Sequence, residues 1–449
     1  MKNGIINELS GKKVLILGFG REGKSTYNFL RMNNVDCTIG IADKNNITEE
    51  NILKTGVLFH TGETYLNAMK EHFGENALPL YASKACCFKR LYEIMAEENM
   101  KADCVSAGEL ATANAAGFPM KNAYFHGNNK TDRDVAYAIE VGVGYFVCDN
   151  EEELFAIERE AEAHGITQKI LLRLTPGIDP HTHKAISTGR VDSKFGAAIE
   201  TGQAMELTRV ALSQKHIDLC GFHCHVGSQI FETEPFTDAA DIMLRFVASA
   251  KKELGYTAKE LNLGGGMGVR YLEAHPAIDY AENIAKIAAK MKALCSDLGI
   301  DLPAVRMEPG RSIVADAGLT LYTVGTLKTI PGFRNYVSID GGMPDNPRYA
   351  LYQSPYSVVL ANRMRETCDT VCTVAGRCCE SGDLIQEGVP LPNPKRGDTL
   401  AVLTTGAYNY AMASNYNRLP RPAKLMLSGG KEKLLLRRET FEDLLRNEL

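Results

Sequence analysis

A lysine at the end of a predicted strand, Lys84, is the residue of this sequence best placed to do covalent chemistry. Residues 77–81 form a short apolar run that predicts a buried strand over 78–82, and Lys84 follows it closely. In α/β barrels the carboxyl ends of the strands converge on a cavity where catalytic groups gather. Apolar walls lower the pKa of a lysine, and its neutral amine can form a Schiff base with a carbonyl group. A solvated lysine is the plainer interpretation, so a chemical role requires partners elsewhere in the sequence.

Three more motifs at predicted strand ends carry groups that a carbonyl cofactor held by a lysine would need. The glycine run 264–266 leaves bare backbone that can approach a phosphate. Glu308 and Arg311 offer a carboxylate and a guanidinium three residues apart. Alternation along a strand puts His223 and His225 on one face. The plainer interpretations are a tight turn, a surface ion pair and a core histidine. We expect all of them at one end of one barrel.

The elements that would position these motifs come from a strand–helix alternation that begins near residue 78 and repeats eight times. Helical patterns separate the strands, for example over 151–164 and 280–298. Eight units in about 240 residues predict an α/β protein built on a (β/α)8 barrel. The predicted strands are 78–82, 103–107, 123–127, 145–149, 169–174, 217–224, 260–264 and 304–308.

After Arg311 the pattern becomes that of a C-terminal β domain, closed by a short amphipathic helix over 439–446. We therefore expect a barrel domain over 73–315 and a β domain over 316–449, preceded by a segment over 1–72. The strands predicted for the β domain are 319–329, 336–340, 370–375, 399–404 and 423–427.

The N-terminal segment carries a nucleotide-binding pattern. A strand leads into the loop 18–25, whose glycines fit the dinucleotide fingerprint, while Lys24 and Ser25 also fit a P-loop. A second strand over 38–42 ends at Asp43, about 20 residues after the last glycine, where a Rossmann unit has its ribose-binding acid. This favours a Rossmann-like segment over a P-loop. Two strands and a helix make only a partial unit.

Composition and charge exclude several classes of partner. The 449 residues carry a net charge of −5, which argues against a nucleic-acid or anionic-membrane partner. No apolar run approaches the roughly 20 residues of a membrane span, and no signal-peptide pattern opens the sequence, so we expect a cytoplasmic protein. The twelve cysteines are then reduced thiols. The pairs Cys86-Cys87 and Cys378-Cys379 lack zinc-ligand spacing, so we expect no metal site.

From about residue 73 to its end, the sequence resembles the diaminopimelate decarboxylase family, pyridoxal-phosphate enzymes of the alanine-racemase-like fold. The resemblance covers about five-sixths of the chain and includes a motif at five of the eight predicted strand ends. The matching motifs are YASKA at 81–85, HGNNK at 126–130, DSKFG at 192–196, HVGSQ at 225–229, LGGG at 263–266, EPGR at 308–311, CESGD at 379–383 and GAY at 406–408.

The resemblance implies pyridoxal 5'-phosphate as the cofactor and a role for each matching residue. Lys84 would bind the cofactor covalently, and Glu308 would pair with its pyridinium nitrogen, which keeps the ring an electron acceptor. The ring would stack on His225, and Tyr408 would contact both cofactor and substrate. The remaining contacts to the cofactor and its phosphate would come from Ser228, Gly264, Gly265, Gly266, Pro309, Gly310 and Arg311.

The implied reaction is decarboxylation of meso-2,6-diaminopimelate to L-lysine and CO2, the last step of lysine biosynthesis. Cys379 would deliver the proton to the α-carbon. In this family the CESGD loop reaches the neighbouring subunit's site, which implies an obligate homodimer with shared active sites. The segment 344–347 departs from the family pattern, and a decarboxylase of ornithine, arginine or carboxynorspermidine is the alternative. The substrate-binding residues implied are Arg311, Arg348, Tyr352, Glu380 and Tyr408.

Residues 1 to about 72 resemble a different family, the muramyl ligase that adds D-glutamate (UDP-N-acetylmuramoyl-L-alanine:D-glutamate ligase). The matching stretches, 11–26, 41–44 and 59–66, belong to its N-terminal uridine-nucleotide-binding part. The ATP-binding domain is missing, so we expect no ligase activity. A helical stripe within 64–73 would cover the barrel side left bare by the missing decarboxylase N-terminus. An inactive fusion with a nucleotide-binding fragment is the alternative outside the enzyme class.

Overall fold

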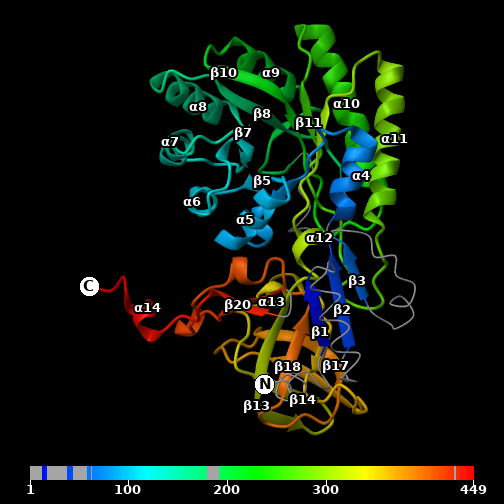
Figure 1. Cartoon of the computed structure of the whole chain (residues 1–449), viewed down its shortest axis with the longest axis vertical. Coiled ribbons are helices and arrows are strands. Elements are labelled where there is room, and N and C mark those ends of the chain that lie inside the picture. The colour runs from blue at the N-terminus through cyan, green and yellow to red at the C-terminus, as the bar shows by residue number, and fades with distance from the viewer. Residues whose placement is uncertain (1–12, 18–37, 44–57, 62, 179–191, 429–430) are drawn as a thin grey trace. The chain divides into compact units, whose positions relative to one another are not determined.

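The computed structural model describes residues 13–17, 38–43, 58–61, 63–178, 192–428 and 431–449. They fall into two compact units (Figure 1). The barrel unit comprises Tyr65–Val269 and Pro276–Ser312. The β unit comprises Arg270–His275 and Ile313–Leu449, together with three N-terminal strands. The domain limits 1–72, 73–315 and 316–449 stay predictions.

Eight parallel strands in the order β4-β5-β6-β7-β8-β10-β11-β12 form the barrel. The first and last strands are joined where Leu80 N–H donates to the Met307 carbonyl at 2.8 Å and Ala82 N–H to that of Pro309 at 3.0 Å. The (β/α)8 prediction is therefore confirmed. The strands are β4 (Leu80–Ala82), β5 (Lys101–Cys104), β6 (Ala123–Phe125), β7 (Tyr145–Cys148), β8 (Gln168–Thr175), β10 (Ile217–His223), β11 (Glu260–Asn262) and β12 (Ala304–Arg306), with the short β9 (Ala197–Ala198) beside β8.

Helices alternate with these strands, and α6, α7, α8 and α11 begin at residues whose side chains cap them. Asn150 caps α8 by accepting the Glu153 N–H at 3.0 Å, and Thr131 and Asp134 form a capping box at α7. The strand predicted over 103–107 ends three residues earlier because Ser106 caps α6. The helices are α5 (Lys89–Glu97), α6 (Ala107–Ala115), α7 (Asp132–Glu140), α8 (Glu151–Ala163), α9 (Gln203–Ser213), α10 (Glu234–Leu254), α11 (Tyr280–Leu298) and α12 (Arg311–Val314), with 3₁₀ turns η1 (Ser83–Ala85) and η2 (Met120–Asn122).

A further helix, α4 (Glu63–Phe73), lies beside α11 in the barrel unit (Figure 1). Its Tyr65 and Met69 are buried. The Tyr65 ring lies 5.9 Å from that of Tyr280, and its hydroxyl lies 3.8 Å from the Met267 sulfur. Burial of this stripe is what the sequence predicted for a helix that covers the barrel flank.

The β unit contains a mixed six-stranded sheet in the order β15-β18-β13-β14-β16-β17 and a hairpin of β19 and β20. The five predicted strands are present within two residues of their predicted limits, and β15, β17 and β20 are additional. The strands are β13 (Leu319–Ile330), β14 (Arg334–Ile339), β15 (Val358–Leu360), β16 (Thr370–Ala375), β17 (Leu384–Leu391), β18 (Thr399–Leu403), β19 (Lys424–Ser428) and β20 (Lys431–Leu436); the helices are α13 (Arg348–Tyr352) and α14 (Phe441–Leu445), and the 3₁₀ turns are η4 (Tyr410–Met412) and η5 (Tyr416–Arg418).

Three parallel strands precede α4: β1 (Lys13–Leu17), β2 (Thr38–Asp43) and β3 (Leu58–Thr61), paired in that order. The third was not predicted. The glycine-rich loop 18–25 and the predicted helix after it lie outside the described residues. The Rossmann-like interpretation stays a prediction. Among the residues with described positions, no helix combines the length and the apolar character needed to cross a bilayer.

Candidate active site

Lys84 lies in the turn η1, directly after β4, and is paired with Asp103 of β5. Its Nζ is 2.7 Å from Asp103 Oδ2. The aspartate side chain is fully buried, while the lysine side chain is 35% exposed. The sequence predicted apolar walls around this amine, and the structure instead places a carboxylate against it. The ion pair holds the amine at the carboxyl end of the barrel, where a ligand can reach it.

Glu308 is buried among three side chains that lie on other strand ends. His126 Nε2 is 3.1 Å from Glu308 Oε1, and His223 Nε2 is 3.2 Å from Oε2. Asn262 Nδ2 donates to Oε1 at 2.8 Å. Burial alone would raise the pKa of Glu308, but attraction to the two histidines outweighs it, and the pKa lies well below its usual value. The alternative of a surface ion pair with Arg311 is therefore wrong.

His223 is the neutral partner in this group. Burial, only partly opposed by Glu308, lowers its pKa to about 4. At neutral pH the Nε2–H of His223 then donates to Glu308. Because the imidazole is neutral, it does not cancel the negative charge of the carboxylate. The rings of His223 and His126 meet edge to face, with centroids 4.8 Å apart. The strand β10 ends at His223, so the predicted alternation does not extend to His225.

We expect folding stability to fall as the pH drops from about 6.5 to about 4. In this range His223 is neutral in the folded protein and protonated in the unfolded chain, so the unfolded state binds more protons. His223→Gln keeps a donor for Glu308 but does not titrate. Urea midpoints measured at pH 7, 5.5 and 4.5 should fall less steeply for this variant. Equal slopes in the two proteins would contradict the assignment.

The glycine run 264–266 packs so closely that no side chain fits. A Cβ on Gly265 would lie 2.0 Å from the Glu308 carbonyl oxygen, and one on Gly266, at φ +122°, would lie 2.3 Å from that of Gly227. Gly264 N–H donates to Asn262 Oδ1 at 2.9 Å, and Gly265 N–H to His225 Nδ1 at 3.3 Å. The run thus connects the Glu308 group to His225 and leaves bare backbone at the strand ends.

His225, Ser228 and the segment 309–311 complete the barrel part of the site. Burial and the charge of Lys84 hold the pKa of His225 well below its usual value. Arg311 Nη2 donates to Ser228 Oγ at 3.0 Å. The Pro309 carbonyl accepts the Ala82 N–H of β4. A Cβ added to Gly310 would lie 2.8 Å from the Ala82 Cβ. A hydroxyl and a guanidinium suited to an anion therefore lie together.

Besides Asn262, four residues that the sequence analysis gave no role belong here. Asp103 contacts Lys84, and His126 contacts Glu308. Asp103 Oδ1 is also 3.6 Å from His126 Nε2. Arg173 is buried, with its guanidinium 4.2 Å from the Phe195 ring centroid, and Asp149 Oδ2 accepts the Gly196 N–H at 2.9 Å. These two hold the DSKFG segment against the barrel. His126 stands in the HGNNK motif, which was the available signal.

Arg348, of α13, is buried in the β unit. Its guanidinium donates to Tyr356 Oη at 3.0 Å and Ser354 Oγ at 3.2 Å, and it lies 4.5 Å from the Tyr271 ring centroid. Among the residues whose placement is described, no carboxylate forms an ion pair with it. Tyr352, on the same helix, is half-buried.

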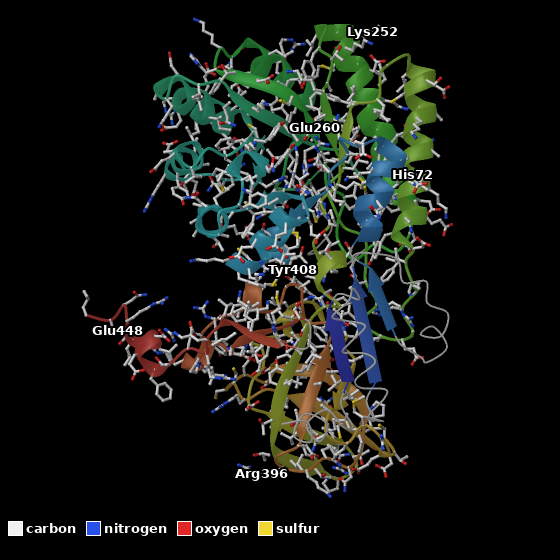
Figure 2. All side chains as sticks on the ribbon, in the orientation of Figure 1. His72, Lys252, Glu260, Arg396, Tyr408 and Glu448 are labelled. Atoms are coloured by element: carbon white, nitrogen blue, oxygen red, sulfur yellow. The ribbon has the colours of Figure 1, made fainter. Side chains whose placement is uncertain are left out.

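The CESGD loop and Tyr408 also lie in the β unit. Cys379 and Glu380 are exposed, and Cys379 N–H donates to Asn417 Oδ1 at 2.8 Å. The buried Asp383 orders the loop by accepting the N–H groups of Cys378 at 2.8 Å and Met343 at 2.6 Å. Tyr408, labelled in Figure 2, is half-buried with φ +59°.

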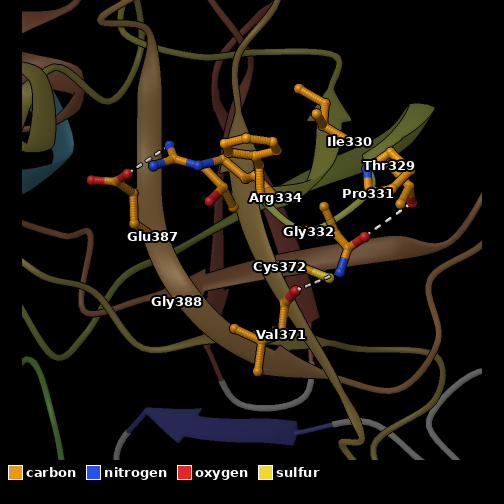
Figure 3. Close-up of a pocket in the computed structure, with 12 residues that line it drawn as sticks. Thr329, Ile330, Pro331, Gly332, Arg334, Val371, Cys372, Glu387 and Gly388 are labelled. Atoms are coloured by element: carbon orange, nitrogen blue, oxygen red, sulfur yellow. Dashed lines mark hydrogen bonds and ion pairs between the residues drawn. The ribbon is translucent and has the colours of Figure 1, made fainter.

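A cavity of about 460 Å³ in the β unit contains none of the predicted site residues. It lies at the β13–β14 turn, against β16 and β17 (Figure 3). Arg334 and Glu387 form an ion pair of 2.7 Å at its edge. The exposed Phe333 and Val371 give it a partly apolar lining.

The residues of the barrel unit fit pyridoxal phosphate. Lys84 supplies an amine that a ligand can reach, and Glu308 is a buried carboxylate held ionised by hydrogen-bond donors. The glycine run excludes any Cβ from the strand ends, which suits close approach of a phosphate. The ligand atoms of His126, His223 and Glu308 also lie within 4.8 Å of one another, a spacing compatible with a metal ion. The adjacent lysine and glycines favour the organic cofactor.

Comparison with known proteins agrees with this geometry. Residues 49–315 match the family described as pyridoxal-dependent decarboxylase, pyridoxal binding domain, so the match starts ahead of the predicted barrel limit at 73. The diaminopimelate decarboxylase of Bacillus subtilis (strain 168) is 45% identical over 376 residues, 84% of this chain and 86% of that protein. That of Staphylococcus aureus (strain COL) is 46% identical over 369 residues, 82% of this chain and 86% of that protein.

A solved diaminopimelate decarboxylase from M. jannaschii, in co-complex with L-lysine, superposes with a TM-score of 0.81 at 29% identity. The superposition covers 99% of this chain and 94% of that one. The fold, the lysine and carboxylate at the barrel end, and identity above 40% to two relatives over 86% of their length all lead to one family. The chain belongs to the pyridoxal-dependent decarboxylases, and among them to the diaminopimelate decarboxylases.

Proposed function

We propose that this protein decarboxylates meso-2,6-diaminopimelate to L-lysine and CO2 with pyridoxal 5'-phosphate as its cofactor. The arrangement of Lys84 beside Asp103, with Glu308 buried among its donors, carries the proposal. The test compares kcat/KM on meso-diaminopimelate with that on L-ornithine and L-arginine. A preference for diaminopimelate of about a hundredfold or more supports the proposal, since the distal carboxylate distinguishes these substrates. A preference for either of the other two contradicts it.

The bound cofactor supplies the electron sink that makes loss of CO2 from an amino acid possible. Lys84 would hold it covalently, with Asp103 orienting the amine. Glu308 would hold the proton at the ring nitrogen, and Asn262 with the two histidines keeps that carboxylate ionised and in place. The phosphate would be bound by Ser228, the glycine run, Gly310 and Arg311, and the ring by His225 and Tyr408.

We assign the distal end of the substrate to Arg311, Arg348, Tyr352 and Glu380. The partners of Arg348 support this because they are neutral hydroxyls. They do not neutralise the buried guanidinium, whose positive charge can therefore attract a carboxylate of the substrate. Glu380 is exposed and can receive an ammonium.

Arg348→Met should raise KM for diaminopimelate by about tenfold to a hundredfold, the worth of one charge-assisted hydrogen-bond pair. Pyridoxal phosphate affinity should not change. Steady-state kinetics test this beside Arg363→Met, which removes a β-unit arginine that already pairs with Glu366 and Asp398. An unchanged KM in Arg348→Met would refute the substrate contact.

We further propose that Cys379 delivers the proton to the α-carbon and does so in the site of a partner subunit, in a homodimer. The exposure of the CESGD loop supports this. Large apolar side chains on the β19–β20 hairpin and α14 are exposed as well, as expected for surfaces that a second copy covers. They are Leu425, Leu427, Leu434, Phe441 and Leu445.

We also propose that the N-terminal segment comes from a uridine-nucleotide-binding domain like that of the D-glutamate-adding muramyl ligase. The parallel order of β1, β2 and β3 supports it. Nucleotide binding by this segment would be tested by calorimetry with a uridine diphosphate sugar. An absence of binding heat would contradict nucleotide binding by this segment.

A further inference from the structure

A buried lysine in the HGNNK motif, Lys130, has no part in the site described so far. The side chains of Lys130 and Glu153 are 2% and 3% exposed, and Lys130 Nζ is 2.6 Å from Glu153 Oε1. Burying two charges costs free energy, and apolar residues of similar volume often stabilise a protein as well or better. Ion pairing alone therefore does not account for a lysine at this position.

The ammonium of Lys130 makes three hydrogen bonds, which use all of its donors. Besides Glu153, its acceptors are the carbonyl oxygens of Gly127 and Val147, each at 2.9 Å. These acceptors belong to the loop after β6, the end of β7 and the first turn of α8. One side chain thus ties together three neighbouring segments at the carboxyl end of the barrel.

The first of these segments carries His126. The His126 N–H donates to the Cys104 carbonyl at 2.8 Å, which ties the residue to β5. Gly127 follows with φ +132°, a conformation that favours glycine, so the chain turns sharply as it leaves the strand. Lys130 holds the carbonyl of this turn. Between these two fixed points the His126 ring reaches Glu308 Oε1 at 3.1 Å.

The second carbonyl links the same lysine to the neighbouring strand end. Val147 stands two residues before Asp149, which holds the Gly196 N–H. Asn150 follows, caps α8 and donates through Nδ2 to the Asn128 carbonyl at 3.5 Å. The loops after β6 and β7 are therefore fixed to each other beside the Glu308 group, and Lys130 is the charged residue between them.

We propose that Lys130 is a positioning residue that sets His126 against Glu308 through the carbonyls of Gly127 and Val147. Its ammonium is bonded to Glu153 and to these two carbonyls, so it would act on the cofactor through His126. The proposal rests on the cofactor site and not on the identity of the substrate.

Three variants separate this role from simple charge balance. Lys130→Met removes the donors and leaves Glu153 buried alone. The double variant Lys130→Met/Glu153→Met removes the whole charge pair and leaves the two carbonyls without their donor. Glu153→Gln removes the negative charge and keeps both carbonyl bonds. Lys101→Met, a half-buried lysine at the other end of the barrel that donates to Tyr124 Oη at 3.0 Å, is the matched control.

Two readouts are needed besides the midpoint of thermal unfolding. One is the dissociation constant of pyridoxal phosphate, measured by equilibrium dialysis. The other is the imidazole ¹⁵N signal of His126 in histidine-labelled apoprotein, assigned with a His126→Gln sample. Neither readout uses the amino-acid substrate, so failure of the proposed activity would not affect them.

In Lys130→Met and the double variant the His126 signal should shift and the dissociation constant should rise by about tenfold or more, as for other residues that orient a binding group. This should hold even where the double variant regains thermal stability. Glu153→Gln and Lys101→Met should keep both readouts close to those of the unchanged protein. If the double variant recovers the His126 signal and the affinity along with its stability, Lys130 is structural only and the proposal is wrong. If Lys130→Met does not fold, the double variant and Glu153→Gln still decide.

Discussion

Replacing Lys84 with alanine should abolish lysine formation from meso-diaminopimelate, with a loss in kcat of about a thousandfold or more. The reason is that, in the proposed mechanism, the amine at the barrel end beside Asp103 anchors the cofactor covalently. Asp103, buried and 2.7 Å away, cannot replace the lysine as this anchor because a carboxylate forms no Schiff base with the cofactor's carbonyl group. The measurement is single-turnover release of CO2 from the protein saturated with pyridoxal phosphate.

Lys101→Ala is the control for the loss of a lysine from the same barrel, and it should retain activity. A second control mixes subunits. If the active site is shared, Lys84→Ala mixed with Cys379→Ala in equal amounts should recover about a quarter of the activity, because half of the dimers carry one intact site. Activity of Lys84→Ala alone above a hundredth of the unchanged protein would contradict the role of the lysine. Lack of recovery in the mixture would contradict only the shared site.

Replacing Glu308 with glutamine should lower kcat by about a hundredfold, while the protein still binds pyridoxal phosphate. An ionised carboxylate can hold a proton at the ring nitrogen, and an amide cannot, so the ring becomes a poorer electron acceptor. The geometry of the group should survive because glutamine keeps an oxygen that can accept from Asn262 or His223. Steady-state kinetics and the absorbance spectrum of the bound cofactor measure the two effects separately.

The chain offers a matched control on the neighbouring strand. Glu260, labelled in Figure 2, is also buried, accepts from Tyr124 Oη at 2.8 Å and pairs with Arg306 at 3.0 Å. Glu260→Gln should reduce stability by about 3 kcal/mol with little change in kcat per folded molecule, because this pair lies at the start of β11, away from the site. If Glu308→Gln turned over like the unchanged protein, the assigned role of this carboxylate would be wrong.

The barrel could be predicted from sequence because its strands are buried on both faces. Segments such as 145–148 and 217–223 are apolar runs between helices with clear periodicity, and their limits differ from the prediction by one residue at most. The β unit was harder. β17 contains Gln386, Glu387 and Gly388, and β20 begins Lys-Glu-Lys, so neither has the pattern of a half-buried strand. These two segments form strands because neighbouring strands pair with their backbones, and their own sequence pattern does not show it.

The residues of the candidate site also fall into a predictable and an unpredictable group. Lys84, Glu308 and the glycine run could be found because each stands in a short motif at a strand end. Asp103 has no local signal, since a single acid in a strand is an ordinary feature, and the signal for His126 was the HGNNK motif at 126–130, which gave it no role. Their roles come from contacts between strands: Asp103 accepts a hydrogen bond from Lys84, and His126 lies against Glu308. Such contacts depend on barrel closure, which sequence patterns do not specify residue by residue.

The most direct test of the central claim is the stoichiometry of products from meso-diaminopimelate. The purified protein, supplied with pyridoxal phosphate, should release L-lysine and CO2 in equal amounts, and both should depend on Lys84. Equal release that is lost in Lys84→Ala would establish both the decarboxylation and its dependence on the lysine at the barrel end. Cofactor binding without either product, or CO2 released from ornithine or arginine instead, would contradict the account.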